Sequence, residues 1–425
     1  MGRTTTIEAP RAGASPGSGT SPAAGAARSA GSPGGDAGAA RGPRLALLDG
    51  LRLVAALLVV LYHYTAWHHG HWGVEPAKDA WPVLSRFTLF GNMGVQLFFV
   101  ISGFVILLSS YGKSPARFIG SRIGRLFPAY WAAVLLTGVL VFFIWPSMGE
   151  RLSYVDWAVN LTMLQGGTGN PHVDGVYWTL WAELRFYALV LLVMLLGWQT
   201  PRRLLAFAAA WPVAALAAPL LPGNFLSHAL MPEYAPLFAG GMVLFLMYRF
   251  GQTPLRWAVL GLNVVLSAHH AGVTGAREAE ELVGYSVPEP VYWAIVAGIF
   301  AVVALLSLTR LRSVSLPGMA LAGALTYPVY LLHQVWGWWI IDQLSPWMPR
   351  WAVLPLVIAI VGAAAYLVHR HIERRFGRRL GQAATRLVEA VEARRAPARA
   401  FARRVMEAPA VRVLPNSVGG IVRGR

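Results

Sequence analysis

Long apolar runs separated by short polar segments dominate the chain from residue 45 onward. An apolar run of about 20 residues can cross the hydrocarbon core of a membrane as a helix. The sequence therefore predicts an all-α membrane protein with about ten transmembrane helices. Their approximate limits are 45–66, 87–109, 126–145, 177–198, 203–221, 231–248, 255–270, 291–309, 317–341 and 351–369.

The polar segments between these runs alternate in charge. Segments 110–125, 199–203, 249–256 and 310–312 carry arginine or lysine, whereas segment 271–290 is acidic and is expected to be an outer loop. Basic loops tend to stay on the cytoplasmic side of a membrane. With an even number of spans, this alternation predicts that both termini are cytoplasmic.

The two ends of the chain differ from residues 44–370, which form the predicted transmembrane domain. Residues 1–43 consist mainly of Ala, Gly, Ser, Pro and Arg without an apolar core, so we expect a disordered tail and no secretory signal. Residues 371–425 are predicted to be a basic cytoplasmic tail. Its apolar residues recur near helical spacing, which fits either an amphipathic helix on an anionic leaflet or a solvated segment.

Composition excludes several classes of function. Of the 425 residues, 56% are hydrophobic and 13% are charged, which excludes an ordinary soluble domain. The absence of cysteine removes thiolate nucleophiles, disulfides and thiolate metal sites. The net charge of +17 would suggest nucleic acid in a soluble protein, but membrane orientation explains arginines beside apolar spans. Membrane lipids are therefore expected partners, and nucleic acid is not.

Ionisable residues inside spans cost roughly 2.5–3.5 kcal/mol on insertion, so each marks a candidate functional site. In the first span, Asp49 and Arg52 lie three residues apart on one helical face near the cytoplasmic end. His63 returns to that face about three turns higher. The first two residues fit an anchoring ion pair or a site, and His63 fits a catalytic group or a histidine satisfied by a neighbouring helix.

Three further spans carry candidate residues. Arg122 and Arg125 share a face at the inner end of the third span, where paired guanidinium groups suit phosphate but also fit plain cytoplasmic orientation. Glu183, with Tyr187 nearby, lies about two turns into the fourth span, at a depth comparable with His63. Its carboxylate could orient that histidine, or it could pair with Arg185 or with another helix. The last two candidates, Tyr330 and His333, lie in the ninth span after the helix-distorting Pro328. They fit either a functional site or structural hydrogen bonding.

The crowded histidines of the first outer loop do not predict a metal site. His68, His69 and His71 have no carboxylate or thiolate partner at a metal-binding spacing. A solvated loop explains them, so no metal is expected.

Several motifs occur together in a characteristic order. They are L-D-G-L-R with a following Y-H, G-V-Q-L-F-F-V-I-S-G-F, R-I-G-R-L-F-P-A-Y, W-T-L-W-A-E-L-R-F-Y, L-F-A-G and Y-P-V-Y-L-L-H. Over roughly residues 45–373 the chain resembles the acyltransferase-3 family of multi-pass membrane acyltransferases, which acylate extracytoplasmic sugars, polysaccharides, lipids and some secondary metabolites. It departs from the family's frequent Glu-x-Pro after the last span, because Arg374 follows Glu373.

The resemblance implies roles for the candidates. His63 is expected to be catalytic, and Arg122 and Arg125 are expected to bind the acyl donor. Glu183 matches the family's acidic position and is expected to orient the His63 imidazole. The expected supporting residues are Asp49, Arg52, Tyr187, Tyr330 and His333. The implied co-substrate is acyl-CoA, acetyl-CoA in particular, with no permanently bound cofactor.

These expectations combine into one reaction. A cytoplasmic acyl-CoA would extend its thioester between helices toward His63, which would act as general base on a hydroxyl of the acceptor near the outer face. An acyl-histidine intermediate remains an open alternative. A transporter or flippase for a lipid-linked sugar or an organic anion is the competing function. The Ala-, Arg- and Gly-rich composition indicates a bacterial protein of the plasma membrane.

Overall fold

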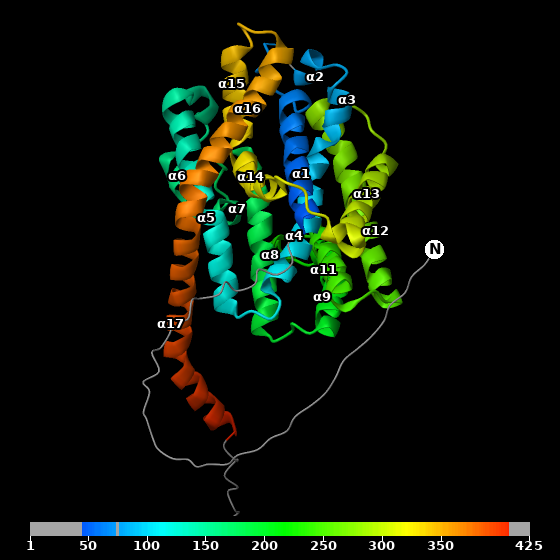
Figure 1. Ribbon diagram of the computed structural model, residues 1–425, viewed down its shortest axis with the longest axis vertical. Coiled ribbons are helices and arrows are strands. Elements are labelled where there is room, and N and C mark those ends of the chain that lie inside the picture. The colour runs from blue at the N-terminus through cyan, green and yellow to red at the C-terminus, as the bar shows by residue number, and fades with distance from the viewer. Residues whose placement is uncertain (1–44, 74–75, 408–425) are drawn as a thin grey trace, which may run out of the picture. The chain divides into compact units, whose positions relative to one another are not determined.

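The computed structural model of the protein describes residues 45–73 and 76–407, and the chain in these ranges is helical without β-strands (Figure 1). The all-α prediction is confirmed. The predicted N-terminal tail and the last part of the basic tail, residues 408–425, lie outside the described residues.

Eight helices in the described ranges are long and apolar enough to cross a membrane, and they correspond to eight of the predicted spans. They are Ala46–Thr65, Ser85–Ser110, Pro115–Ile144, Gly175–Leu195, Pro201–Leu220, Phe225–Phe250, Glu289–Leu308 and Arg350–Arg394. The main helices within them are α1 (Ala46–Thr65), α4 (Gly94–Ser110), α5 (Pro115–Val139), α8 (Trp178–Leu195), α9 (Pro201–Ala217), α11 (Ala235–Phe250), α13 (Glu289–Leu308) and α16 (Arg350–Val368).

The other two predicted spans differ from the structure. The predicted span 255–270 belongs to the longer helix α12 (Pro254–Glu278), which continues as a π-helix over Ala279–Val283. The predicted acidic loop 271–290 is therefore wrong over much of its length. Hydropathy identified where the apolar run ends. The helix extends beyond that point, because helical hydrogen bonds pair the backbone of polar residues as well.

The predicted ninth span, 317–341, is interrupted. Helix α14 (Met319–Leu332) ends at His333, and α15 (Gln334–Leu344) begins directly after it. Pro328 lies inside α14, where it removes a backbone donor. The break brings the backbone of His333 into the protein interior, beside α1.

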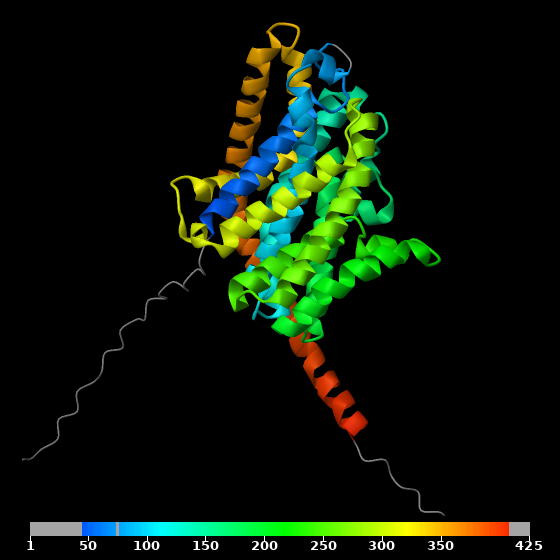
Figure 2. The same ribbon diagram turned by 90° about the vertical axis from the view of Figure 1, so that its right-hand side faces the viewer.

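Helix α17 (Arg374–Glu407) continues α16 through the π-helical turn His369–Glu373 and extends past the rest of the bundle (Figures 1 and 2). The continuous helix Arg350–Arg394 has 45 residues, about 68 Å at 1.5 Å per residue. This length exceeds the roughly 30 Å of a hydrocarbon core. Its basic part follows the direction of α16 and packs along α5.

Glycines allow α5 and α17 to approach closely. Gly120 and Gly124 of α5 face Gly377 and Gly381 of α17, and a Cβ at Gly124 would overlap the carbonyl oxygen of Gly377. Small residues four positions apart are typical of close helix pairs in membranes. The contact supports the part of α5 that leads to Arg125.

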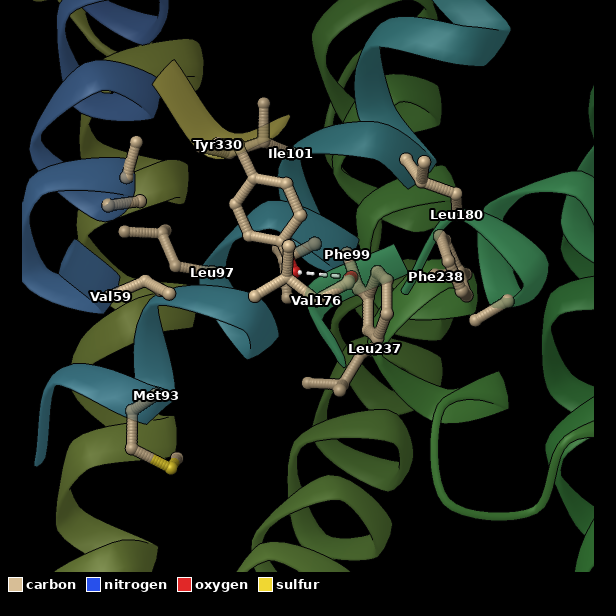
Figure 3. Packing of buried hydrophobic residues seen from close by; sticks show 14 of the residues in the cluster. Val59, Met93, Leu97, Phe99, Ile101, Val176, Leu180, Leu237, Phe238 and Tyr330 are labelled. Carbon is tan, nitrogen blue, oxygen red and sulfur yellow. Dashed lines mark hydrogen bonds between the residues drawn. The ribbon is translucent and has the colours of Figure 1, made fainter. Parts of the chain in front are cut away.

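Helices α4 and α11 lie at the centre of the bundle. Every residue of α11 from Ala235 to Met247 is buried, as expected for a helix surrounded by others. Figure 3 shows Phe99 of α4 next to Phe238 of α11, and their ring centroids are 4.6 Å apart. Tyr330 of α14 reaches into the same region, where its hydroxyl donates to the Val176 carbonyl at 3.1 Å.

Candidate active site

His63 lies in the last turn of α1 and lines a cavity of about 240 Å³, which we call the histidine cavity. The cavity lies between the end of α1, the start of α4, the start of α8 and the second half of α12. Its polar and aromatic lining residues are Tyr62, His63, Trp67, Asn92, Gln96, Trp178, Glu233, Tyr234, Ser267, His270, Thr274, Glu278 and Tyr330.

The hydrogen bonds of His63 define one arrangement of its protons. Its Nδ1 lies 2.9 Å from the Val59 carbonyl oxygen and 3.2 Å from Nε2 of His333. Nδ1 of His333 lies 2.7 Å from the Tyr330 carbonyl oxygen. Because a carbonyl only accepts, both histidines are assigned a proton on Nδ1. The assignment leaves the lone pair of the His63 imidazole on Nε2, the atom a general base requires.

The ring and the backbone of His63 are held by tryptophans. The Trp67 ring stacks on the imidazole with a centroid distance of 5.3 Å and an interplanar angle of 23°. The indole N–H of Trp338 donates to the His63 carbonyl oxygen at 2.9 Å. These contacts restrict the orientation of the imidazole, as precise proton transfer requires.

The break between α14 and α15 places His333 against His63. The Tyr64 hydroxyl donates to the His333 carbonyl oxygen at 2.7 Å, and Gly337 leaves room for the Tyr64 ring. His333 is fully buried, and Tyr330 is nearly so. The structure therefore brings together His63, Tyr330 and His333, which the sequence had singled out separately.

A second, smaller cavity of about 60 Å³ adjoins the first, and we call it the arginine cavity. Val95 and Tyr330 line both cavities. The remaining lining residues of the arginine cavity are Arg52, Phe98, Phe99, Ser102, Arg125, Thr179, Leu180, Glu183, Thr326 and Tyr327. The lining thus has two cations, Arg52 and Arg125, and one carboxylate, Glu183, and aromatic rings make up much of the rest.

The two arginines of α5 have different surroundings. Arg125 lines the arginine cavity, lies 3.5 Å from the Glu373 carboxylate, and stacks on the Tyr327 ring. Arg122 lies outside this lining, with its guanidinium carbon 5.7 Å from the centroid of the Tyr187 ring. The shared helical face predicted for the pair is therefore divided between two environments.

Glu183 does not reach His63 in this structure. Its carboxylate accepts hydrogen bonds from the Tyr187 hydroxyl at 2.5 Å and from Ser102 at 3.3 Å. The prediction that Glu183 orients the imidazole is corrected, because His333 occupies the position beside His63 Nδ1. Glu183 instead belongs to the arginine cavity.

Arg52 lies between the charged groups of this cavity. Asp49, Glu183 and Arg125 are the charged side chains that act on it, and its Nε atom is buried without a hydrogen-bond partner. Asp49 also packs against Gly323 of α14. The predicted supporting pair of α1 is thus next to the arginine cavity.

The sequence analysis missed the polar face of α12. Ser267, His270, Thr274 and Glu278 recur at spacings of three or four residues and all line the histidine cavity. This spacing was the signal that could have identified them. Assignment of Glu278 to an outer loop concealed it.

Two buried groups outside the spans, His69 and Asp174, have large pKa shifts. Burial, reinforced by the charge of His71, lowers the pKa of His69 to about 3. Burial raises the pKa of Asp174 to about 7, although backbone N–H groups of Val176 and Val335 donate to it. Asp174 thereby connects the start of α8 to α15. Among the described residues, no three His, Asp or Glu side chains form a group that could hold a metal ion.

The bundle is a multi-pass membrane protein with two adjoining cavities between its helices. Residues 45–369 match the family model described as an acyltransferase domain, and the chain belongs to this acyltransferase family. The resemblance found in the motifs is confirmed. The prediction of a bacterial membrane protein is confirmed as well.

Curated relatives agree with this assignment. The chain is 27% identical over 347 residues to the putative membrane-bound transacylase BcsY of Komagataeibacter xylinus, covering 77% of this chain and 81% of that protein. It is 29% identical to the exopolysaccharide production protein ExoZ of Rhizobium meliloti, over 58% and 77% of the two chains. It is 33% identical to nodulation protein 10 of Rhizobium leguminosarum, over 42% and 51%, so the match spans about half of that relative. No solved structure matches the chain.

Proposed function

We propose that the protein transfers an acyl group from cytoplasmic acyl-CoA to a hydroxyl of an acceptor near the outer face of the membrane, with His63 as general base. The observation that carries the proposal is that two cavities adjoin at Val95 and Tyr330, one with arginines and the other with His63. A transferase that joins two different substrates needs such a meeting point.

The arginine cavity suits the donor. Arg125 and Arg52 present guanidinium groups that can form charge-assisted bonds with the phosphates of coenzyme A, and Arg122 lies on the same helix as Arg125. The apolar wall near Phe98 and Phe99 fits the uncharged pantetheine arm. The thioester of a bound acyl-CoA, with acetyl-CoA as the first candidate, would then lie near Tyr330.

The histidine cavity suits the acceptor. Nε2 of His63 takes the proton of the acceptor hydroxyl as its oxygen attacks the thioester carbonyl carbon. A C–O bond forms, the C–S bond breaks, and the leaving thiolate of coenzyme A takes the proton from His63. His333 holds the Nδ1 side of the imidazole throughout. An acyl group carried on His63 itself is the alternative route.

The names of two relatives point to the acceptor class. One is an exopolysaccharide production protein, and another is a nodulation protein. These names favour a polysaccharide-related acceptor over a lipid or a secondary metabolite. The polar lining of the histidine cavity supports the same choice.

Donor binding to the purified protein tests the proposal. Radiolabelled acetyl-CoA and longer acyl-CoAs are titrated against wild type, the double variant Arg122→Ala/Arg125→Ala, His63→Ala and Arg117→Ala. We expect the double variant to bind acyl-CoA at least about tenfold more weakly, which corresponds to a loss of about 1.4 kcal/mol in binding free energy. His63→Ala and the exposed Arg117→Ala, a matched control on the same helix, should bind like wild type.

Failure of wild type to bind any acyl-CoA would contradict the proposal and favour a transporter or flippase. Rapid-quench analysis separates the two chemical routes. Label retained on the protein before acceptor is added would overturn direct transfer and favour an acyl-histidine.

A further inference from the structure

The histidine cavity is acidic in a basic protein. The chain carries a net charge of +17, yet the described residues that line this cavity include Glu233 and Glu278 and neither lysine nor arginine. Arg185 lies close enough to act on Glu233, and Arg277 acts on Glu278 from an exposed position outside the lining. Neither arginine lines the cavity, so both carboxylates face a cavity whose own described lining supplies no cation.

Buried polar atoms in the wall also lack partners. Ser267 is 1% exposed, lines the cavity, and its hydroxyl makes no hydrogen bond in the described structure. The side-chain oxygens of Asn92 and Gln96 are likewise buried and unpartnered. Buried polar groups in native proteins are nearly always satisfied, so these atoms indicate a ligand or water in the cavity.

The orientation of Asn92 follows from Glu278. The Asn92 amide nitrogen donates to the Glu278 carboxylate at 3.4 Å. An ionised carboxylate can only accept, so this nitrogen faces Glu278 and the amide oxygen remains for a ligand. The wall near α12 and α4 therefore offers oxygen acceptors in excess of donors.

Aromatic rings complete this environment. Trp67, Trp178 and Tyr234 line the same cavity, and the last two rings lie 5.4 Å apart. A cation near the face of such a ring is stabilised by the ring quadrupole. A protonated amine supplies three N–H donors and a positive charge, which matches both the oxygen acceptors and the rings.

We infer that the acceptor carries a protonated amine near its reacting hydroxyl, with Glu278, Asn92 and Gln96 as its binding site. An amino sugar is the simplest compound of this class. The inference rests on the proposed function in taking the histidine cavity as the acceptor site. It adds that an acceptor with a carboxylate at this position is rejected.

The proposed contact also selects the nucleophile. An ammonium nitrogen has no lone pair, so it cannot attack the thioester while it is bound to Glu278. The hydroxyl next to His63 is then acylated, with formation of the C–O bond and release of the coenzyme A thiol. Binding of the charged amine therefore directs acylation to oxygen.

A matched pair of oligosaccharides tests the inference without any acyl donor. The β-1,4-linked tetramer of glucosamine and the corresponding tetramer of glucose differ only in an amine or a hydroxyl at each ring. We expect wild type to bind the glucosamine tetramer at least about tenfold more tightly near neutral pH. Glu278→Gln should lose this preference, whereas Glu150→Gln, an exposed control outside the cavity, should keep it.

A pH titration sharpens the test. Deprotonation of the amine at higher pH should remove the preference of wild type for the glucosamine tetramer. Glu233, His63 and His270 are further ionisable residues in the lining of this cavity, so the glucose tetramer measured at each pH serves as the reference. Glu278→Asp should retain part of the preference. Elution of Glu278→Gln itself as a monodisperse peak excludes misfolding as the cause of its changed binding.

Equal binding of the two tetramers, or no binding of the glucosamine tetramer, would overturn the inference. A preference for the glucosamine tetramer that persists in Glu278→Gln would also overturn the inference. Binding of acyl-CoA is measured in the separate donor experiment, so a failure here is distinguishable from a failure of the proposed function.

Discussion

The two cavities adjoin, yet their walls have opposite character. The arginine cavity has two cations, Arg52 and Arg125, against the single carboxylate of Glu183, whereas the histidine cavity has Glu233 and Glu278 and no arginine or lysine in its described lining. Under the proposed function, this difference in charge would favour an anionic donor in the first cavity and disfavour it in the second. Specificity depends on repulsion of the wrong ligand as well as attraction of the right one.

The largest effect is expected from loss of the base in the histidine cavity. His63→Gln should lower the rate of acyl transfer by about 10²–10⁴-fold, the usual contribution of a general base. Donor affinity should stay within about twofold, because the arginine cavity is unchanged. Steady-state transfer rates and acyl-CoA titration check the two halves of this prediction. A variant with more than a tenth of wild-type activity would contradict the role of His63.

A smaller effect is expected at His333, which positions the imidazole. His333→Leu removes the partner of His63 Nδ1 and should lower kcat about tenfold, equivalent to one hydrogen bond of about 1.4 kcal/mol. The KM for the donor should not change, and the acid limb of the kcat profile against pH should move. His333→Gln, which keeps a polar atom near the Nε2 position, should restore part of the rate. Equal loss in both variants would point to a general packing defect instead.

The arginine cavity depends on the contact between α5 and α17. Gly124→Ala introduces a Cβ against the backbone of Gly377 and should destabilise the protein by about 1–3 kcal/mol, as overpacking does. It should also weaken acyl-CoA binding, because Arg125 follows directly. Gly362→Ala is the control, since a Cβ at Gly362 meets open space. Thermal unfolding in detergent and donor titration measure both effects, and equal stability of the two variants would contradict the close contact.

The smallest effect concerns pH near the histidine cavity. Burial lowers the pKa of His69 to about 3, so the folded protein keeps this residue neutral while the unfolded chain takes up a proton below about pH 6.5. The free energy of unfolding should therefore fall as pH decreases from about 6.5 toward 3, by on the order of 1–2 kcal/mol at pH 5. His71 stacks on His69 with ring centroids 5.0 Å apart and lies 3.8 Å from Asp342. Unfolding at pH 7.5 and 5 should differ less in His69→Asn, and an unchanged difference would exclude His69 as the cause.

Hydropathy predicted the fold class and most helices, because a helix in a membrane needs a long apolar run. It failed where a helix is not uniformly apolar. Helix α12 carries Ser267 and Glu278 on the face toward the histidine cavity, so its second half was assigned to a loop. The break at His333 was missed because α14 and α15 together form one apolar run.

The candidate residues were found from the cost of placing ionisable groups in apolar spans. This criterion singled out His63, Arg125 and Glu183, and the two that line the arginine cavity are Arg125 and Glu183. It could not pair them. The prediction that joined Glu183 to His63 relied on their similar depth in two helices. Depth alone does not determine which sides of the two helices are in contact.

By itself, the sequence determined that the protein is a helical membrane acyltransferase and which polar side chains lie within its spans. Only the tertiary structure decided their partners: His63 with His333, Arg125 with Glu373, and Glu278 with Asn92. Local hydropathy depends on neighbours along the chain, whereas these contacts join residues up to 270 positions apart. Helix packing and a break in one helix bring them together, and neither is encoded in the periodicity of a single segment.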